Sequence, residues 1–514
     1  MTEIKQDSLK KRYLLKLTGN LTGLGVGIIT QSIVPRALGP SSYGNFSFLT
    51  GFFWQVVGFL NLNSSTAFYT KLSQRQHEKR LVNFYLYFAA VLAAVVCLFP
   101  VIVLLAGKNE FIWPGQEREF IMMGAVWALL SFCMMVLGDM CDAYAVTVQS
   151  ESAKAGMKVL GLILILSMYF AGWFSLRNFF IYQFFTLSAT CVVLVLIIVK
   201  YRHAFSEISL LTKNEIRAYL GEFTPFCAPL VVFSGVAVSE AILDRWFLQQ
   251  FSGSRQQGFY GLAYQIGAIG FTFASAMVPL VAREQAMSFV SKDIGEMGRT
   301  FSRFVPMLYS IVVYFACFFA VEARNIVLIF GGKAYLEAVL PIAVMSFFPI
   351  HQTYGQLNAT VFFATGETVL YRNIGLMFTL IGIPATFFLL GPREYGGLQA
   401  GALGLAAKMI VLQVLSANVQ LWFLTKLMRL SFRKFLLHQV GVVVVFTALA
   451  ALCSYGARIF LPAGHFLVQF IISGLLYTTG VAAVGFYCPW FFSLRKGEIA
   501  GLLGRLAEKA GLAR

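Results

Sequence analysis

About 14 apolar stretches, each long enough to form a membrane-spanning helix, recur along the 514-residue chain. A helix of about 20 apolar residues crosses the hydrocarbon core of a bilayer, which is about 30 Å thick. Only 12% of the residues are charged, whereas soluble globular proteins have about 25%. The sequence therefore predicts an all-α polytopic membrane protein. The predicted spans cover approximately residues 13–38, 42–69, 81–106, 119–146, 157–174, 179–199, 223–251, 258–282, 304–321, 338–364, 372–390, 398–424, 437–461 and 466–488.

The distribution of basic residues predicts how these spans are oriented. If the N-terminal segment "KQDSLKKRYLLK" is cytoplasmic, most of the 40 lysine and arginine residues fall on cytoplasmic segments, including those that begin at Lys71, Lys200 and Lys426. This distribution is typical of the positive-inside rule. We therefore expect a multi-pass protein with both termini in the cytoplasm. The net charge of +17 then reflects topology and attraction to anionic membrane lipids, and nucleic acid is not an expected partner.

The sequence contains no pattern typical of a catalytic or metal site. Its eight cysteines are scattered through apolar spans without a C-x-x-C pair, and we expect them to act as small hydrophobic residues. Ser/His/Asp arrangements, phosphate-binding Gly-rich loops and metal-ligand clusters are absent from the sequence. The connections between spans are also too short for a soluble catalytic domain. We therefore expect no enzyme activity, no cofactor and no metal.

Two weakly similar segments indicate an internal duplication. The segments "ALGPSSYGNFSFLTGF" and "QFSGSRQQGFYGLAYQIG" align Gly44 with Gly258, an offset of 214 residues. The connections "QSESAKAGMK" and "ATGETVLYRN" align Glu151 with Glu367, an offset of 216. The offsets predict two parallel six-helix bundles, an arrangement that many transporters use for alternating access. The predicted parts are an N-terminal bundle over 1–200, a cytoplasmic linker over 201–222, a C-terminal bundle over 223–424, and helices 13 and 14 with a cytoplasmic tail over 425–514.

Several of these segments resemble one family of membrane proteins. The opening "LLKLTGNLTGLGVGIITQSIVPRALGPSSYGNFSF", with Leu38-Gly39-Pro40 followed by Tyr43-Gly44, resembles that of bacterial polysaccharide (O-antigen, Wzx-type) flippases. These flippases belong to the multidrug/oligosaccharidyl-lipid/polysaccharide (MOP) exporter superfamily. The segments "ILDRWFLQQFSG", "LIFGGKAYLEAVLPI" and "FFATGETVLYRN" also resemble this family. The resemblance implies the bacterial inner membrane, a MATE-like V-shaped pair of bundles around a central cavity, and a lipid-linked oligosaccharide as substrate.

Among the ionisable residues inside predicted spans, where a charge is costly and often functional, two positions stand out: a cluster on the seventh span and a lysine on the twelfth. Glu240, Asp244 and Arg245 lie on the seventh span, and we expect them to take part in ion coupling or in structural pairing. Lys408 shares a helical face with Gly401 and Gly404. Its amine is expected to face a substrate cavity and bind the pyrophosphate or an acidic sugar unit, or to form a structural ion pair.

Polar residues on several spans predict further parts of a transport path. A hydrated substrate cavity is expected to contain Asn20, Gln31, Arg36, Gln55, His351 and Asn358 in addition to Lys408. A second group is expected at the cytoplasmic mouth of the path and consists of Asp139, Asp142, Lys154, Lys158 and Arg372. Such residues can line a pore, join helices, or form ordinary positive flanks of a span.

Together these patterns favour a flippase that moves a polyprenyl-pyrophosphate-linked oligosaccharide across the inner membrane by alternating access through a central cationic cavity. The alternative is an ion-coupled multidrug or cation antiporter of the same superfamily. The flippase hypothesis implies a lipid-linked oligosaccharide and anionic lipids as partners. It also implies polysaccharide polymerase and chain-length machinery as protein partners in surface polysaccharide biosynthesis.

Overall fold

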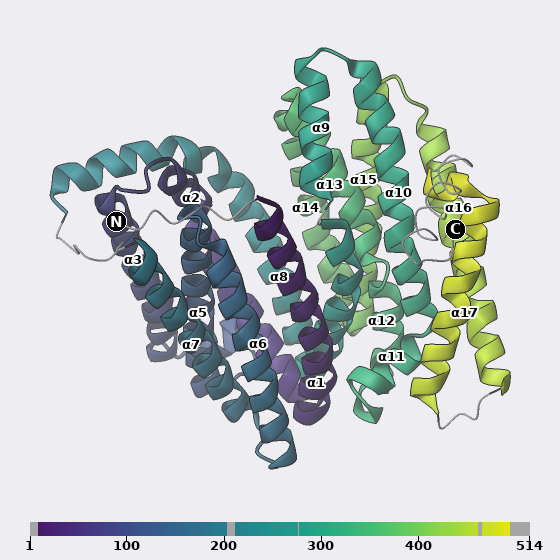
Figure 1. Ribbon diagram of the computed structural model, residues 1–514. Helices are drawn as coiled ribbons and strands as arrows, with labels where there is room; N and C mark the ends of the chain where they lie inside the picture. The colour runs from purple at the N-terminus through teal and green to yellow at the C-terminus, as the bar shows by residue number, and fades with distance from the viewer. Residues whose placement is uncertain (1–8, 203–210, 276, 461–464, 494–514) are drawn as a thin grey trace. The chain divides into compact units, whose positions relative to one another are not determined.

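The computed structural model describes residues 9–202, 211–275, 277–460 and 465–493, which form helices and turns with no β-strand among them. By their contacts, the residues divide into two compact units, Met1–Gly258 (unit 1) and Phe259–Arg514 (unit 2). The predicted linker 201–222 lies partly, and the predicted tail after 493 wholly, outside the described residues. Figure 1 shows the helices along the chain.

Unit 1 is built from long helices that pack lengthwise. Helix α1 packs against α5 and α6, and α5 packs against α7. Large aromatic side chains such as Phe53, Phe68 and Trp113 are fully buried in its core, where close packing stabilises the bundle. The helices are α1 (Leu9–Asn61), α2 (Ser64–Gln74), α3 (Lys79–Leu105), α4 (Asn109–Ile112), α5 (Arg118–Ala143), α6 (Thr147–Phe170), α7 (Leu176–Arg202) and α8 (Lys213–Ser275), which continues into unit 2.

Unit 2 has a second core in which α10 packs against α16, and α15 packs against both α13 and α14. Its helices are α9 (Val278–Val290), α10 (Ile294–Val321), α11 (Ala323–Phe330), α12 (Val339–Met345), α13 (Phe348–Thr365), α14 (Thr368–Leu390), α15 (Gly401–Leu427), α16 (Phe432–Phe460) and α17 (Phe466–Tyr487). Three short 3-10 helices are η1 (Lys333–Ala338), η2 (Arg393–Tyr395) and η3 (Pro489–Phe492).

The predicted polytopic helical class is confirmed. Ten helical segments of the described residues are long and apolar enough to cross a membrane. Helices α1 and α8 are additional, and each contains one predicted span in full and most of a second. The total of 14 spans stays a prediction.

Both long helices bend at a glycine that has a backbone conformation closed to other residues. Gly39 has φ 73° and ψ 169°, and Gly253 has φ 75° and ψ 179°. This region of backbone space is essentially restricted to glycine. The two bends are 214 residues apart, the same offset that aligns Gly44 with Gly258. The sequence similarity therefore corresponds to two bends of the same backbone geometry.

The two bends also contact each other, and the contact is reciprocal. A Cβ atom at Gly44 would collide with the carbonyl oxygen of Ser254, and a Cβ atom at Gly258 would collide with that of Pro40. Pro40 and Ser254 are themselves 214 residues apart. Each repeat therefore supplies a glycine that lets the backbone of the other approach closely.

Some predicted boundaries were wrong. The predicted span 42–69 is divided, because Leu62 and Asn63 have positive φ angles of 47° and 58°. The side chain of Asn61 accepts hydrogen bonds from Ser64 Oγ at 2.8 Å and from the backbone N–H of Ser65 at 3.2 Å. These bonds satisfy groups at the start of α2 and stabilise the break. Helix α6 also begins ten residues before the predicted span 157–174.

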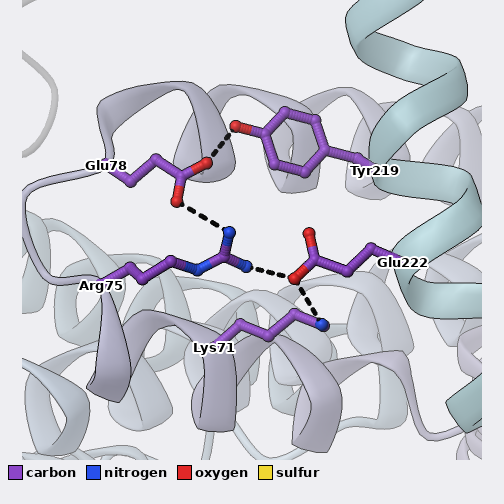
Figure 2. Close-up of polar contacts among 5 residues, drawn as sticks. All are labelled: Lys71, Arg75, Glu78, Tyr219 and Glu222. Atoms are coloured by element: carbon purple, nitrogen blue, oxygen red, sulfur yellow. Dashed lines mark hydrogen bonds and ion pairs between the residues drawn. The ribbon is translucent and has the colours of Figure 1, made fainter.

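A cluster of charged residues joins the start of α8 to the α2–α3 connection within unit 1 (Figure 2). Glu222 accepts from Lys71 Nζ at 2.7 Å and from Arg75 Nη2 at 2.5 Å. Arg75 also pairs with Glu78 at 3.1 Å, and the hydroxyl of Tyr219 donates to Glu78. The start of α8 is thereby attached to the end of unit 1 that is predicted to be cytoplasmic.

Candidate functional site

Unit 1 encloses a cavity of about 700 Å³ between α1, α5, α6 and α7. Its volume lies in the range of about 300–1,000 Å³ that is usual for small-molecule sites. Glycine, methionine, threonine and tyrosine residues line much of it. The charged or amide residues that line it are Gln31, Asp139, Asp142, Glu151, Lys154 and Lys158. Five of these six were predicted site residues, and the structure brings them together.

The charges are arranged on two neighbouring helices. Asp139 and Asp142 lie three residues apart on α5, and Glu151, Lys154 and Lys158 follow on α6. Side chains three, four and seven residues apart share a helical face. The ammonium group of Lys154 donates to Glu151 Oε1 at 3.0 Å. Glu151 was not predicted as a site residue, although it lies three residues before Lys154 on the same helix.

Two glycines make room for the lysine ends. A Cβ atom at Gly138 on α5 would lie 3.1 Å from the Nζ atom of Lys154, and one at Gly23 on α1 would collide with the Nζ atom of Lys158. The two ammonium groups therefore lie against different helices, each at a position without a side chain. The sequence contained the two glycines, but only the packing of α6 against α1 and α5 shows what they accommodate.

Unit 2 contains a cavity of about 800 Å³ with a different chemical character. Helices α9, α13, α14 and α15 form its walls. Its polar lining consists of His351, Gln352, Gln356, Thr360, Tyr371, Gln413, Ser416 and Gln420, and alanine, valine, glycine and phenylalanine form the rest. His351 was a predicted cavity residue. The four glutamines were not predicted.

Two other predicted cavity residues of unit 2 are buried without lining this cavity. The Asn358 amide is fully buried and donates from Nδ2 to the backbone oxygen of Ala417 at 2.9 Å, which joins α13 to α15. Lys408 on α15 is only 4% exposed. This burial agrees with the expectation that the amine faces the protein interior. Its role in substrate binding stays a prediction.

The remaining predicted residues occupy varied positions. Gln55 is half-buried, Arg36 and Arg372 are exposed, and none of the three lines either of these two cavities. Arg372 contacts Asn373 Oδ1 at 3.1 Å. The side chain of Asn20 lies outside the described part of the chain.

Arg245 takes part in the contact at the Gly253 bend. Its guanidinium donates to Gln257 Oε1 at 3.1 Å and to Ser47 Oγ at 3.3 Å, and the Gln257 amide donates back to the Arg245 carbonyl. Arg245 thus connects the two arms of α8 and also α1. Glu240 and Asp244 are half-buried on the same helix.

The fold is shared with solved membrane transporters. No family model and no curated protein matches the chain in sequence. The structure titled lipid II flippase MurJ, inward closed conformation, matches with a TM-score of 0.68 over 92% of this chain and 99% of its own, at 11% identity. An inward-facing multidrug resistance MATE family transporter of the MOP superfamily matches with a TM-score of 0.58 over 83% of this chain and 100% of its own, at 13% identity. A MOP superfamily transporter from Pyrococcus furiosus has a TM-score of 0.51 at 13% identity, over 82% and 97% of the two chains.

The chain thus combines helices long and apolar enough to cross a membrane with a fold that is also found in solved membrane transporters. More narrowly, two of these structures of similar fold are titled as transporters of the MOP superfamily. The resemblance that the sequence motifs indicated is therefore confirmed at the level of the fold.

Proposed function

We propose that the protein is a flippase that moves a polyprenyl-pyrophosphate-linked oligosaccharide from the cytoplasmic to the outer leaflet of the bacterial inner membrane. The observation that carries the proposal is the lysine pair in the unit 1 cavity. Lys154 and Lys158 project from one face of α6 into a cavity large enough for a ligand. A solved structure of similar fold is titled as the flippase of a lipid-linked substrate, lipid II.

The lysines suit a pyrophosphate for electrostatic reasons. An ammonium is a compact charge with three hydrogen-bond donors. Two ammonium groups can therefore contact different oxygens of one pyrophosphate. At about 4 Å and an effective dielectric constant of about 20, each attraction is on the order of 4 kcal/mol before desolvation and before the opposing repulsion from the three carboxylates of the cavity. Glu151 holds Lys154 in place through the 3.0 Å bond. Translocation requires no bond chemistry, so the site needs only to bind, orient and release its ligand.

Lys154 and Lys158 lie at the end of unit 1 that is predicted to face the cytoplasm, where a lipid-linked precursor would be loaded. Duplicated bundles permit alternating access in transporters generally. Polysaccharide polymerase and chain-length machinery are the partners that we expect to receive the product in the outer leaflet.

The same cavity supports a second candidate function. Its three carboxylates, Asp139, Asp142 and Glu151, could bind a coupling cation or a proton, and another solved structure of similar fold is titled as a multidrug transporter. An ion-coupled antiporter for cationic compounds would depend on these carboxylates rather than on the lysines.

The two candidates are separated by a translocation assay in proteoliposomes. The substrate is a polyprenyl-pyrophosphate oligosaccharide whose sugars become cleavable by an external glycosidase when they are flipped. We expect wild-type protein to flip it, and Lys154→Gln with Lys158→Gln to slow flipping at least tenfold. Lys108→Gln is the matched control, because Lys108 is exposed and does not line the cavity. Absence of flipping, together with ion-driven efflux of a cationic dye that Asp139→Asn and Asp142→Asn abolish, would establish the antiporter instead.

A further inference from the structure

The cavity in unit 2 has a polar lining that consists of uncharged side chains and the imidazole of His351. Among the described residues that line it, none is aspartate, glutamate, lysine or arginine. Its polar surface comes mainly from four glutamine amides, one serine and one threonine. An anion would require cationic partners, and a hard metal cation would usually require carboxylates. The lining therefore fits a ligand that is neutral and rich in hydrogen-bonding groups.

Two of the glutamines have an unused acceptor. Gln413 and Gln420 each have a buried Oε1 atom that receives no hydrogen bond in the structure. Gln420 is only 7% exposed. The Gln413 amide donates to Gln352. Buried acceptors without donors are costly, and rotation of these two side chains towards the cavity they line would let ligand hydroxyl groups satisfy the oxygens.

The four glutamines lie in pairs on two helices, α13 and α15. Gln352 and Gln356 are four residues apart on α13, and Gln413 and Gln420 are seven apart on α15. Both spacings place the side chains on one helical face. An amide offers one acceptor and two donors, and a sugar hydroxyl is both a donor and an acceptor. A row of amides can therefore bind successive hydroxyls of a glycan chain.

Apolar residues complete the match. Val278, Ala282 and Ala286 of α9 line the cavity together with Phe363 and Tyr371. The Phe363 and Tyr371 rings contact each other edge to face, with centroids 5.3 Å apart. Sugars have apolar C–H faces beside their hydroxyls, so a lining of amides with aromatic and aliphatic surface suits both parts of the ring.

We propose that the unit 2 cavity binds uncharged sugar units of the lipid-linked oligosaccharide, with Gln413 and Gln420 as hydroxyl acceptors. This inference rests on the proposed flippase function and deepens it, because it assigns the sugar units of the substrate to a neutral, amide-lined cavity. It also identifies the class of glycan as one without carboxylate groups on the units that enter this cavity.

The test measures binding of three probes to purified protein in nanodiscs. The probes are undecaprenyl pyrophosphate, the same lipid carrying a neutral tetrasaccharide, and the same lipid carrying a tetrasaccharide with uronic acid units. We expect wild-type protein to bind the neutral glycan lipid at least tenfold more tightly than the glycan-free lipid, and more tightly than the acidic one. Gln413→Leu with Gln420→Leu should reduce the tenfold advantage to less than threefold and leave affinity for the glycan-free lipid unchanged.

Two further variants separate loss of binding from loss of folding. Gly355 lines the cavity, and a Cβ atom there would meet no other atom within 4 Å. Gly355→Leu should therefore direct its side chain into this open space and remove the glycan advantage in the same way. Gln265→Leu is the matched control, because Gln265 also has a buried Oε1 without a donor but does not line this cavity. It should keep the full advantage.

Each other result overturns the proposal in a recognisable way. A wild-type protein that binds all three probes equally would overturn the sugar site and leave the flippase function standing. Retention of the tenfold advantage by the double glutamine variant and by Gly355→Leu would place glycan recognition elsewhere. Equal affinity for the neutral and acidic glycans would contradict the uncharged class. Failure of wild-type protein to bind any of the probes would overturn the flippase function and this inference together.

Discussion

Lys408 illustrates how burial at a single residue changes the expected effect of a substitution. It lies in the interior of α15 and is 4% exposed. We predict that Lys408→Met, which keeps most of the side-chain volume, lowers the free energy of unfolding by about 1–3 kcal/mol, because a buried polar group loses its partner. The measurement is the melting temperature of the detergent-solubilised protein. Lys333→Met, at an exposed lysine of the same unit, should leave it unchanged.

A different result for Lys408 would assign it to transport. If Lys408→Met retains the wild-type melting temperature but no longer flips the lipid-linked oligosaccharide, the amine contacts the substrate. In that case the sequence-based expectation of a cationic group in the substrate path would stand for this residue.

The candidate site residues show what a sequence can predict at this scale. Lys154 and Lys158 were predictable because a four-residue spacing places both on one helical face whatever the helix packs against. The function of Gly23 and Gly138 was not, because it depends on which helices lie beside α6. For Gln413 and Gln420 a signal existed in their seven-residue spacing, but glutamines on one helix face also join neighbouring helices. Only their unused acceptors and the cavity beside them distinguish the two roles.

At the scale of elements, the reciprocal contact of the two bends predicts that glycines at the contact and glycines away from it tolerate substitution very differently. We expect Gly44→Ala or Gly258→Ala to destabilise the protein by about 1–3 kcal/mol, because the new methyl group would collide with a backbone carbonyl. Gly51→Ala in the same helix meets nothing within 4 Å, and should be neutral or stabilising, since alanine favours a helix. Thermal unfolding of the three variants tests this.

The double variant tests whether the contact is truly shared. Gly44 and Gly258 keep the same two backbone segments close. If the first new methyl group moves these segments apart, the second methyl group should cost much less stability. The Gly44→Ala, Gly258→Ala protein should therefore lose less stability than the two single losses added together. Full additivity would show that the two collisions are relieved independently and that the bends do not act as one contact.

The attachment of the α8 start to the α2–α3 connection predicts a dependence on pH. The hydrogen bond from Lys71 and the nearby Arg75 lower the pKa of Glu222 from its ordinary 4.5. A lowered carboxyl pKa stabilises the attachment above pH 4.5, and this contribution is lost as the pH falls through the folded-state value. Burial, followed by the contact with Glu78, raises the pKa of Tyr219, so its phenol stays protonated through neutral pH.

Hydrogen–deuterium exchange of residues 213–222 measures this attachment. After correction for intrinsic rates, exchange should increase as the pH is lowered from 6 to 3.5. Glu222→Gln should exchange faster already at pH 6 and respond less to pH, with an effect of at most about 1 kcal/mol, since the ion pairs are partly exposed. Glu119→Gln, which removes an ion pair with Arg177 instead, should behave like wild type. Equal exchange in all three proteins would mean that other contacts hold the start of α8.

Helix boundaries were the least predictable feature of the elements. Apolar length located the spans, because it depends only on composition within a window. The break after Asn61 depends on a side chain that bonds the backbone of Ser64 and Ser65 locally, and a hydropathy window does not detect it. The bends of α1 and α8 were signalled by their Gly/Ser clusters, and the backbone leaves the helical conformation at Gly39 and Gly253, where two helical arms meet.

At the scale of the whole molecule, the number of spans and their direction follow from one testable assumption. If each arm of α1 and of α8 crosses the membrane once, these four arms add to the ten other segments, and both termini lie on the same side. The bends and the turns after α6 and α14 would then face outward, and the turns after α9 and α13 would face the cytoplasm.

Labelling of single cysteines with a membrane-impermeant maleimide in intact cells tests this topology, in a background where the eight native cysteines are replaced. Ser41→Cys, Trp173→Cys and Tyr395→Cys should be labelled from outside, whereas Ser291→Cys and Glu367→Cys should react only after permeabilisation; all five positions are exposed. Ser41→Cys is the most informative variant, because Ser41 follows the Gly39 bend and its labelling tests whether α1 crosses the membrane. If it is protected while Trp173→Cys reacts, α1 does not reach the outer surface and the protein has fewer than 14 spans. Labelling of Ser291→Cys and Glu367→Cys in intact cells, with protection of the other three positions, would instead show that the basic segments face outward, contrary to the positive-inside rule.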